Sequence, residues 1–113
     1  MHELAITQSI VEMIVERTDG ASVTAVHLRI GKVSGVMPDA LRFCFDLVAD
    51  GTPVQGARLE IDEPPGRARC RACGATFAVD DLVVLCACGS ADVEVLGGDE
   101  LLVSAVELAG EVA

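Results

Sequence analysis

The spacing of apolar side chains predicts two helices in the first half of the chain. Between residues 3 and 18, apolar side chains recur three or four positions apart over a broad arc, which is typical of a helix that packs on a sheet and on a neighbouring helix. Pro38 and Asp39 suit the first turn of a second helix, which residues 50–53 end. The apolar positions of this helix predict a buried stripe at Leu41, Cys44, Phe45 and Val48.

Alternation with a period of two predicts strands elsewhere. Residues 23–33 place Val26, Leu28 and Ile30 on one side of an extended segment, and residues 58–62 alternate apolar with charged side chains. Two further strands are predicted at 93–96 and 101–108, and the last is long and apolar enough to pair back into the first sheet. These elements predict an α+β fold, in which two helices pack on a small three-stranded sheet.

A break in the pattern predicts how the chain is divided. Pro64-Pro65-Gly66 interrupts regular structure and precedes a cysteine-rich segment of about residues 67–92. We therefore predict a discontinuous α/β domain formed by residues 1–64 and 98–113. Residues 65–97 would form an inserted metal-binding domain that resembles a zinc ribbon built on zinc knuckles.

Composition and charge narrow the function. The chain has 113 residues, of which 51% are hydrophobic, and 18 acidic residues against 8 Lys+Arg give a net charge of −10. Such an acidic chain with few aromatic residues is disfavoured for binding nucleic acid or anionic membranes. The first residues do not have the pattern of a signal peptide, and no apolar run has the length of a membrane span. We therefore expect a cytoplasmic protein.

Four of the five cysteines lie close together in the pattern C-x2-C-x12-C-x-C, at Cys70, Cys73, Cys86 and Cys88. A glycine follows each pair, and thiolate pairs on two such turns can surround one tetrahedral ion, for which zinc is the default in a reducing compartment. Four protein ligands would leave no open position for a substrate, so the site would be structural.

Other interpretations of the cysteines remain open. Iron in a rubredoxin-like site is a rival to zinc, because paired knuckles also hold iron. Free thiols in a small core fit the sequence less well, because the glycine turns bring the four cysteines together as ligands would need. A C-x-x-C redox pair also fits less well, since no thioredoxin-like strand and helix flank the motif. Cys44 is expected to be a small buried hydrophobic residue.

The amino terminus offers a second candidate metal site. The amine of Met1, the amide nitrogen and imidazole of His2 and a carboxylate from Glu3 could form the planar, nitrogen-rich arrangement that Ni(II) and Cu(II) prefer. From these residues alone, a solvated histidine without a ligand role is the stronger interpretation. No pattern of a nucleophile with a base and no phosphate-binding glycine loop is present, so we expect no enzymatic activity.

Several motifs together resemble the HypA/HybF family nearly from end to end. They are Met1-His2-Glu3-Leu4, Ile30-Gly31-Lys32-Val33-Ser34-Gly35, Phe43-Cys44-Phe45-Asp46, Cys70-x2-Cys73-Gly74 and Cys88-Gly89-Ser90. The resemblance implies a nickel metallochaperone for maturation of [NiFe] hydrogenase, and in some organisms of urease, with an inserted zinc domain. It implies nickel ligands at His2, Met1 and Glu3, and zinc ligands at the four cysteines. The second pair, C-x-C, departs from the C-x2-C that is common in the family.

The resemblance also implies partners. These would be a nickel-handling GTPase, the precursor of the hydrogenase large subunit and, in some organisms, urease accessory proteins. From the acidic composition we expect no nucleic acid and no membrane among the partners. The choice between a monomer and a homodimer stays open. The alternatives are a zinc-ribbon interaction module that transfers no nickel, or an electron carrier with iron bound to the four cysteines.

Overall fold

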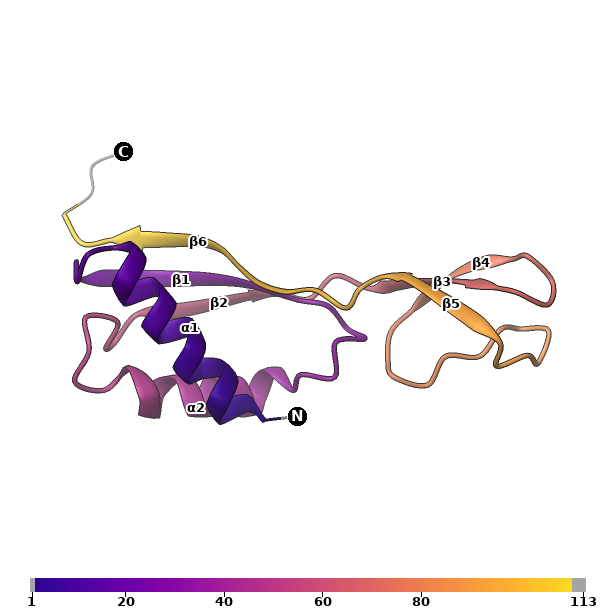
Figure 1. Cartoon of the computed structure of the whole chain (residues 1–113), viewed down its shortest axis with the longest axis horizontal. Helices are drawn as coiled ribbons and strands as arrows, with labels where there is room; N and C mark the ends of the chain where they lie inside the picture. Colours follow the sequence, from indigo (N-terminus) through magenta and orange to yellow (C-terminus); the bar gives the residue numbers. More distant parts are fainter. Residues whose placement is uncertain (1, 111–113) are drawn as a thin grey trace. The chain divides into compact units, whose positions relative to one another are not determined.

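The computed structural model describes residues 2–110, which contain two helices and six strands. In chain order (Figure 1) these are α1 (Glu3–Arg17), β1 (Val23–Ile30), α2 (Pro38–Ala49), β2 (Arg58–Asp62), β3 (Gly66–Cys70), β4 (Thr76–Val79), β5 (Val93–Gly97) and β6 (Leu101–Leu108). The strands form two three-stranded sheets, with the orders β2-β1-β6 and β4-β3-β5. The predicted α+β fold class is confirmed.

The chain divides into two compact units. The helix-and-sheet unit contains residues 1–28, 36–61 and 103–113, and the cysteine unit contains residues 29–35 and 62–102. The domain boundaries that the sequence suggested, 1–64 with 98–113 and 65–97, stay a prediction about which parts fold independently. Within the described residues, no helix is both long enough and apolar enough to cross a membrane.

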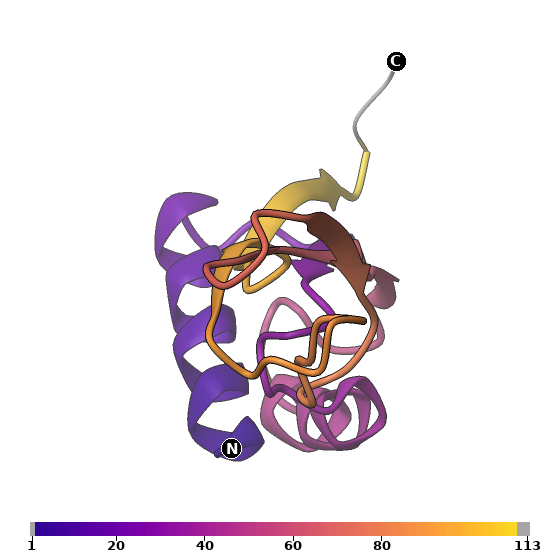
Figure 2. The same ribbon diagram turned by 90° about the vertical axis from the view of Figure 1, so that its right-hand side faces the viewer.

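In the helix-and-sheet unit, α1 and α2 lie on the same face of the sheet β2-β1-β6 (Figures 1 and 2). The sequence explains this layer, because α1 buries Thr7, Ile10, Val11 and Ile14 on one side. The stripe on α2 is narrower than predicted: Leu41, Phe45 and Ala49 are buried, whereas Cys44 and Val48 are only half-buried. Pro38 occupies the first turn of α2, as predicted.

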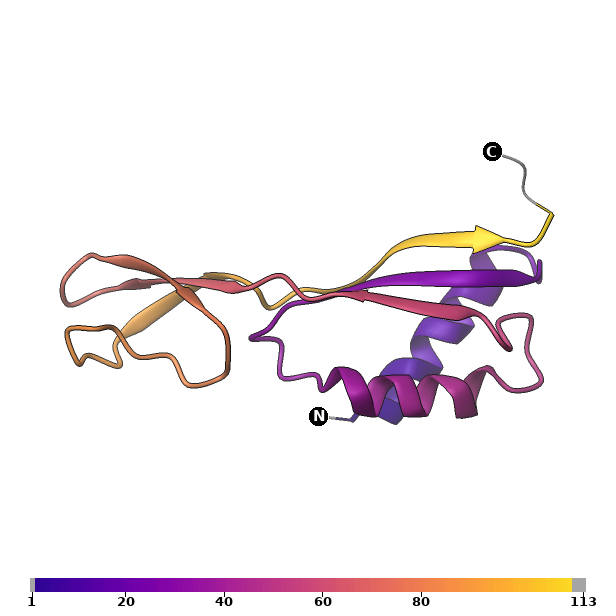
Figure 3. The same ribbon diagram turned by 180° about the vertical axis from the view of Figure 1, so that it is seen from behind.

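Strand β6 returns the end of the chain to β1, which Figure 3 shows from the opposite side. The Ala109 N–H donates to Ser22 O at 2.9 Å, and the Ser104 hydroxyl donates to His27 O at 3.2 Å. The predicted pairing of the last strand with the first sheet is therefore confirmed. β1 ends at Ile30, three residues before the predicted end.

The face of this sheet away from the helices carries charged side chains. His27 Nε2 lies 2.6 Å from Glu107 Oε2, and Arg58 Nη2 lies 3.2 Å from the same oxygen. Arg58 also pairs with Glu60 of the same strand at 2.6 Å. Glu107 on β6 thus contacts side chains of both β1 and β2, and these contacts join all three strands. His27 is half-buried and takes part in this network.

The cysteine unit contains an antiparallel sheet in which β3 lies between β4 and β5. Strands β3 and β4 fall in the segment for which the sequence indicated only turns and metal ligands. The segment that follows β1 touches the segment that follows β5, at Gly31 and Gly98. A Cβ on Gly31 would overlap the Gly98 carbonyl. The Val33 N–H donates to Gly98 O at 2.9 Å, which holds the two segments together.

Candidate metal centre

The first pair of cysteines lies on a tight turn at the end of β3. The Gly74 N–H donates to Cys70 O, and the Cys70 N–H donates to Ala75 O, both at 2.8 Å. Gly74 adopts a φ of 80°, a left-handed conformation that glycine adopts without a steric penalty. The turn therefore holds Cys70 and Cys73 on one side of the loop.

The second pair lies on a turn that is one residue shorter but closes in the same way. The Gly89 N–H donates to Cys86 O at 2.9 Å, and the Cys86 N–H donates to Ser90 O at 3.0 Å. Gly89 has a φ of 93°. Removing one residue from the C-x2-C pattern has thus kept the two closing hydrogen bonds.

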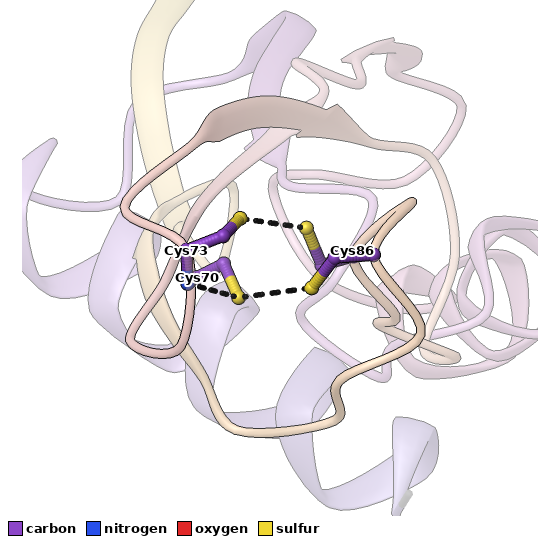
Figure 4. Close-up of side chains that lie close together, drawn as sticks. Cys70, Cys73 and Cys86 are labelled. Carbon is purple, nitrogen blue, oxygen red and sulfur yellow. Dashed lines mark hydrogen bonds between the residues drawn. The ribbon is translucent and has the colours of Figure 1, made fainter.

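The four sulfur atoms of the two turns face one another. Cys70 Sγ lies 3.7 Å from Cys88 Sγ, and Cys73 Sγ lies 3.5 Å from Cys86 Sγ. All four lie within 4.8 Å of one another, and Figure 4 shows the sulfurs of the first turn pointing toward the second. A tetrahedron with Zn–S bonds of about 2.3 Å has edges of about 3.8 Å. The cluster therefore has the donor set and the size for a metal such as zinc.

Electrostatics favour a cation at this position. The N–H groups of Cys73 and Ala72 lower the pKa of the Cys70 thiol to about 6, so that it ionises near neutral pH. The N–H of Cys88 acts in the same direction on Cys86, but burial and the other three sulfurs outweigh it and raise the pKa of Cys86 to about 12. Four neighbouring thiols resist complete ionisation, and a divalent cation at their centre would remove this resistance.

At the amino terminus, the structure describes His2 and Glu3, whereas Met1 lies outside the described residues. His2 is exposed, and its carbonyl accepts a hydrogen bond from the Ile6 N–H at 3.1 Å. Glu3 Oε2 accepts a hydrogen bond from the Met37 N–H at 3.1 Å, which is the main cause of the lowered pKa of the Glu3 carboxyl. Sequence reasoning missed this contact, which ties the start of α1 to the start of α2.

The two candidate sites differ in whether their side chains lie together. It brings the four cysteines together, while His2 and Glu3 belong to no group of three or more metal-binding side chains among residues 2–110. Cys44, the fifth cysteine, is outside the cluster on α2. A site at the amino terminus would therefore have to use backbone nitrogen and the amine of Met1.

Comparison with known proteins decides the family. The model of the family described as "Hydrogenase/urease nickel incorporation, metallochaperone, hypA" matches residues 1–108. The chain belongs to the HypA family. Hydrogenase maturation factor HypA from Nostoc sp. is 47% identical over 108 residues, which are 96% of each chain. HypA from Geotalea uraniireducens is 47% identical over 109 residues, covering 96% of this chain and 99% of the relative.

The fold agrees with that of solved HypA structures. The solution structure of the Ni metallochaperone HypA from Helicobacter pylori matches with a TM-score of 0.64 at 22% identity, over 98% of this chain and 100% of that one. A second solution structure of a HypA protein has a TM-score of 0.58 at 20% identity. As a member of the HypA family, the chain is a metallochaperone of hydrogenase maturation and not an enzyme.

Proposed function

We propose that this chain binds one Ni(II) ion at its amino terminus and delivers it during maturation of [NiFe] hydrogenase. The ligands would be the amine of Met1, the amide nitrogen and imidazole of His2, and a carboxylate oxygen of Glu3. The observation that carries the proposal is the exposed position of His2 at the start of α1, in a chain whose family membership extends over residues 1–108. Within residues 2–110, no hydrogen bond engages the His2 imidazole, so it is available to a metal ion.

The local structure supports a site that both holds and releases nickel. The Ile6 N–H fixes the His2 carbonyl, and the Met37 N–H fixes one carboxylate oxygen of Glu3, so the second oxygen stays available to a metal. An exposed site with few ligands lets an acceptor's ligands replace them one at a time. Because the amine, the amide and the imidazole must lose protons to bind, nickel affinity should fall on acidification.

Cys70, Cys73, Cys86 and Cys88 would hold a resident zinc ion, for which their sulfur spacing is suited. When bound, zinc would link the two turns of the cysteine unit and stabilise its fold. The four cysteine thiolates would fill all four coordination positions of zinc, which leaves no open position at which nickel could bind. Cys86 and Cys88 would both be ligands, because each of their sulfurs already contacts one sulfur of the first pair.

Delivery requires protein partners of the maturation system. The partners we propose are a nickel-handling GTPase, the precursor of the hydrogenase large subunit and, in organisms that use the protein for urease, urease accessory proteins. An acceptor can reach the exposed His2 directly, and whether the chain acts as a monomer or a homodimer does not change this step.

Replacing His2 tests the nickel site, and the chain offers a matched control because it has only two histidines. We expect His2→Ala to lower nickel affinity at least a hundredfold, since the variant loses the imidazole that completes the chelate, which calorimetry would measure. His27→Gln should bind nickel like the wild type, because His27 contacts Glu107 on the sheet. Native mass spectrometry should find one zinc in all three proteins.

Two outcomes would contradict the proposal. Unchanged nickel binding in the His2→Ala variant would remove the amino terminus as the site. Displacement of zinc by one equivalent of nickel would instead make the four cysteines the nickel site.

A further inference from the structure

Strand β3 concentrates positive charge on one face of an acidic protein. Three of the eight Lys+Arg residues lie at alternate positions: Arg67 and Arg69 on β3, and Arg71 directly after it. The residues that alternate with the arginines are buried on the opposite face of the strand: Gly66, Ala68 and Cys70. The period of two in a β-strand therefore turns the side chains of Arg67 and Arg69 to the same face. The exposed Arg71 comes next, and its N–H donates to Asp92 O at 2.9 Å, which continues the pairing beyond the end of β3. We call these three residues the arginine strip.

Two members of the strip pair with exposed carboxylates, and Arg71 Nη1 also donates to Val93 O at 3.1 Å. Arg69 Nη2 lies 3.4 Å from Glu94 Oε2, and Arg71 Nη1 lies 3.1 Å from Asp92 Oδ1. The side chains of both arginines are half exposed, at 50% and 55%. Ion pairs of this kind contribute little stability and exchange readily. An incoming carboxylate could therefore replace Glu94 or Asp92 without disturbing the fold.

Arg67 is the open end of the strip. Its neighbours across the sheet are Ala78 on β4 and Gly97 on β5, both too small to cover a guanidinium group. The ion pairs formed among residues 2–110 do not include Arg67. A guanidinium fork that faces solvent without a carboxylate can bind one in a bidentate manner.

We propose that the arginine strip is a docking surface for an extended acidic segment of a partner protein. Alternate side chains of an extended peptide are about 6.6 Å apart, which is the spacing of Arg67 and Arg69 on β3. A partner strand with carboxylates at every second position would therefore meet Arg67 and Arg69 in register, with Arg71 just beyond the end of β3. Because the rest of the chain is acidic, the strip is where a negatively charged partner would be attracted rather than repelled.

A peptide fits this surface better than a nucleic acid does. Phe77 is the only aromatic residue of the segment 66–97, and it lies on the other face of the sheet with Ala68. The strip therefore lacks a platform on which bases could stack. It does not involve the amino terminus, so it can be tested independently of nickel binding.

The test measures binding of a fluorescent peptide that alternates glutamate and threonine to the full chain by fluorescence anisotropy. We expect Arg67→Glu to weaken binding about tenfold, because one attraction becomes a repulsion, and Arg67→Lys to retain part of the affinity because it keeps the charge. Arg17→Glu on α1 is the matched control, with the same change in net charge, and should change affinity less than twofold. Zinc content and amide NMR dispersion would verify that the Arg67 variants are folded.

Three outcomes would overturn the proposal. In the first, the folded Arg67→Glu variant binds the peptide as the wild type does. In the second, a peptide with glutamine in place of glutamate binds equally well. In the third, a single-stranded oligonucleotide binds more tightly than the acidic peptide and loses affinity in the same variants, which would make the strip a nucleic-acid site.

Discussion

The helix-and-sheet unit and the cysteine unit differ in what fills their interiors. The first buries large side chains from both helices and from β1, including Ile14, Leu28 and Phe45. In the second, the buried apolar side chains are Ile30, Ala68, Cys70, Val79 and Cys86, so two of the five are cysteines. Burial of apolar area can stabilise the first unit, whereas the second has too little of it and would depend on a metal cross-link.

Removal of metal should produce the largest difference between the two units. With excess chelator, we expect the amide NMR signals of β3, β4 and β5 to lose their dispersion, because the sulfur cluster would no longer be held together. Circular dichroism at 222 nm should change little, since α1 and α2 both belong to the other unit. NMR is the suitable probe because the chain has no Trp or Tyr.

Cysteine variants serve as the control for this experiment. Cys73→Ser should reproduce the effect of chelator, while Cys44→Ser should retain zinc because Cys44 lies outside the cluster. If the helical signal were lost at the same chelator concentration as the sheet signals, the two units would form one cooperative fold and the contrast between them would fail.

A core substitution should affect the helix-and-sheet unit alone. Phe45 is 1% exposed, and we expect Phe45→Ala to lower the free energy of unfolding by about 3–5 kcal/mol through lost apolar burial and the cavity left behind. Phe43→Ala is a close control, because Phe43 lies two positions earlier on the same helix and is 68% exposed. It should change the same quantity by no more than about 0.5 kcal/mol.

Urea unfolding followed at 222 nm would compare these two variants, and metal analysis should give the same zinc content for both. Equal losses of stability for Phe45→Ala and Phe43→Ala would mean that the apolar core of this unit does not stabilise it as argued. A loss of zinc from Phe45→Ala would show that the two units are coupled.

The sequence predicted the helix-and-sheet unit better than the cysteine unit, for a physical reason. Strand β2 alternates large apolar side chains with charged ones, and strand β6 contains several large apolar side chains. The first and last residues of both strands were therefore predictable. Strand β3 alternates Gly66, Ala68 and Cys70 with arginines, and such small buried residues give no hydrophobic signal. The strand was therefore missed, although its period of two is present.

For the candidate sites, the spacing of cysteines that are close in sequence predicted their grouping, whereas contacts between residues far apart in sequence could not be predicted. The grouping of the four cysteines could be predicted because each pair is close in sequence and a glycine follows it. The hydrogen bond between Glu3 and Met37 joins residues 34 positions apart and depends on how α1 packs against α2. No pattern along the chain encodes that packing, and the same holds for the contact of His27 with Glu107, 80 positions apart.

The smallest expected effect concerns the charged face of the helix-and-sheet unit. The hydrogen bond with His27, followed by the charge of Arg58, lowers the pKa of the Glu107 carboxyl in the folded protein. A carboxyl with a lowered pKa stabilises the fold at pH values above its ordinary pKa, and this contribution is lost as pH falls through the lowered value.

Glu107→Gln should therefore lower the Tm at pH 7 by only a few °C, because the partners are exposed. The difference from the wild type should shrink as the pH falls through the lowered pKa of Glu107. Glu12→Gln, an exposed position on α1, should leave the Tm unchanged across the same pH range. A Tm difference for Glu107→Gln that did not depend on pH would mean that the charge of the Glu107 carboxylate contributes nothing to joining the three strands.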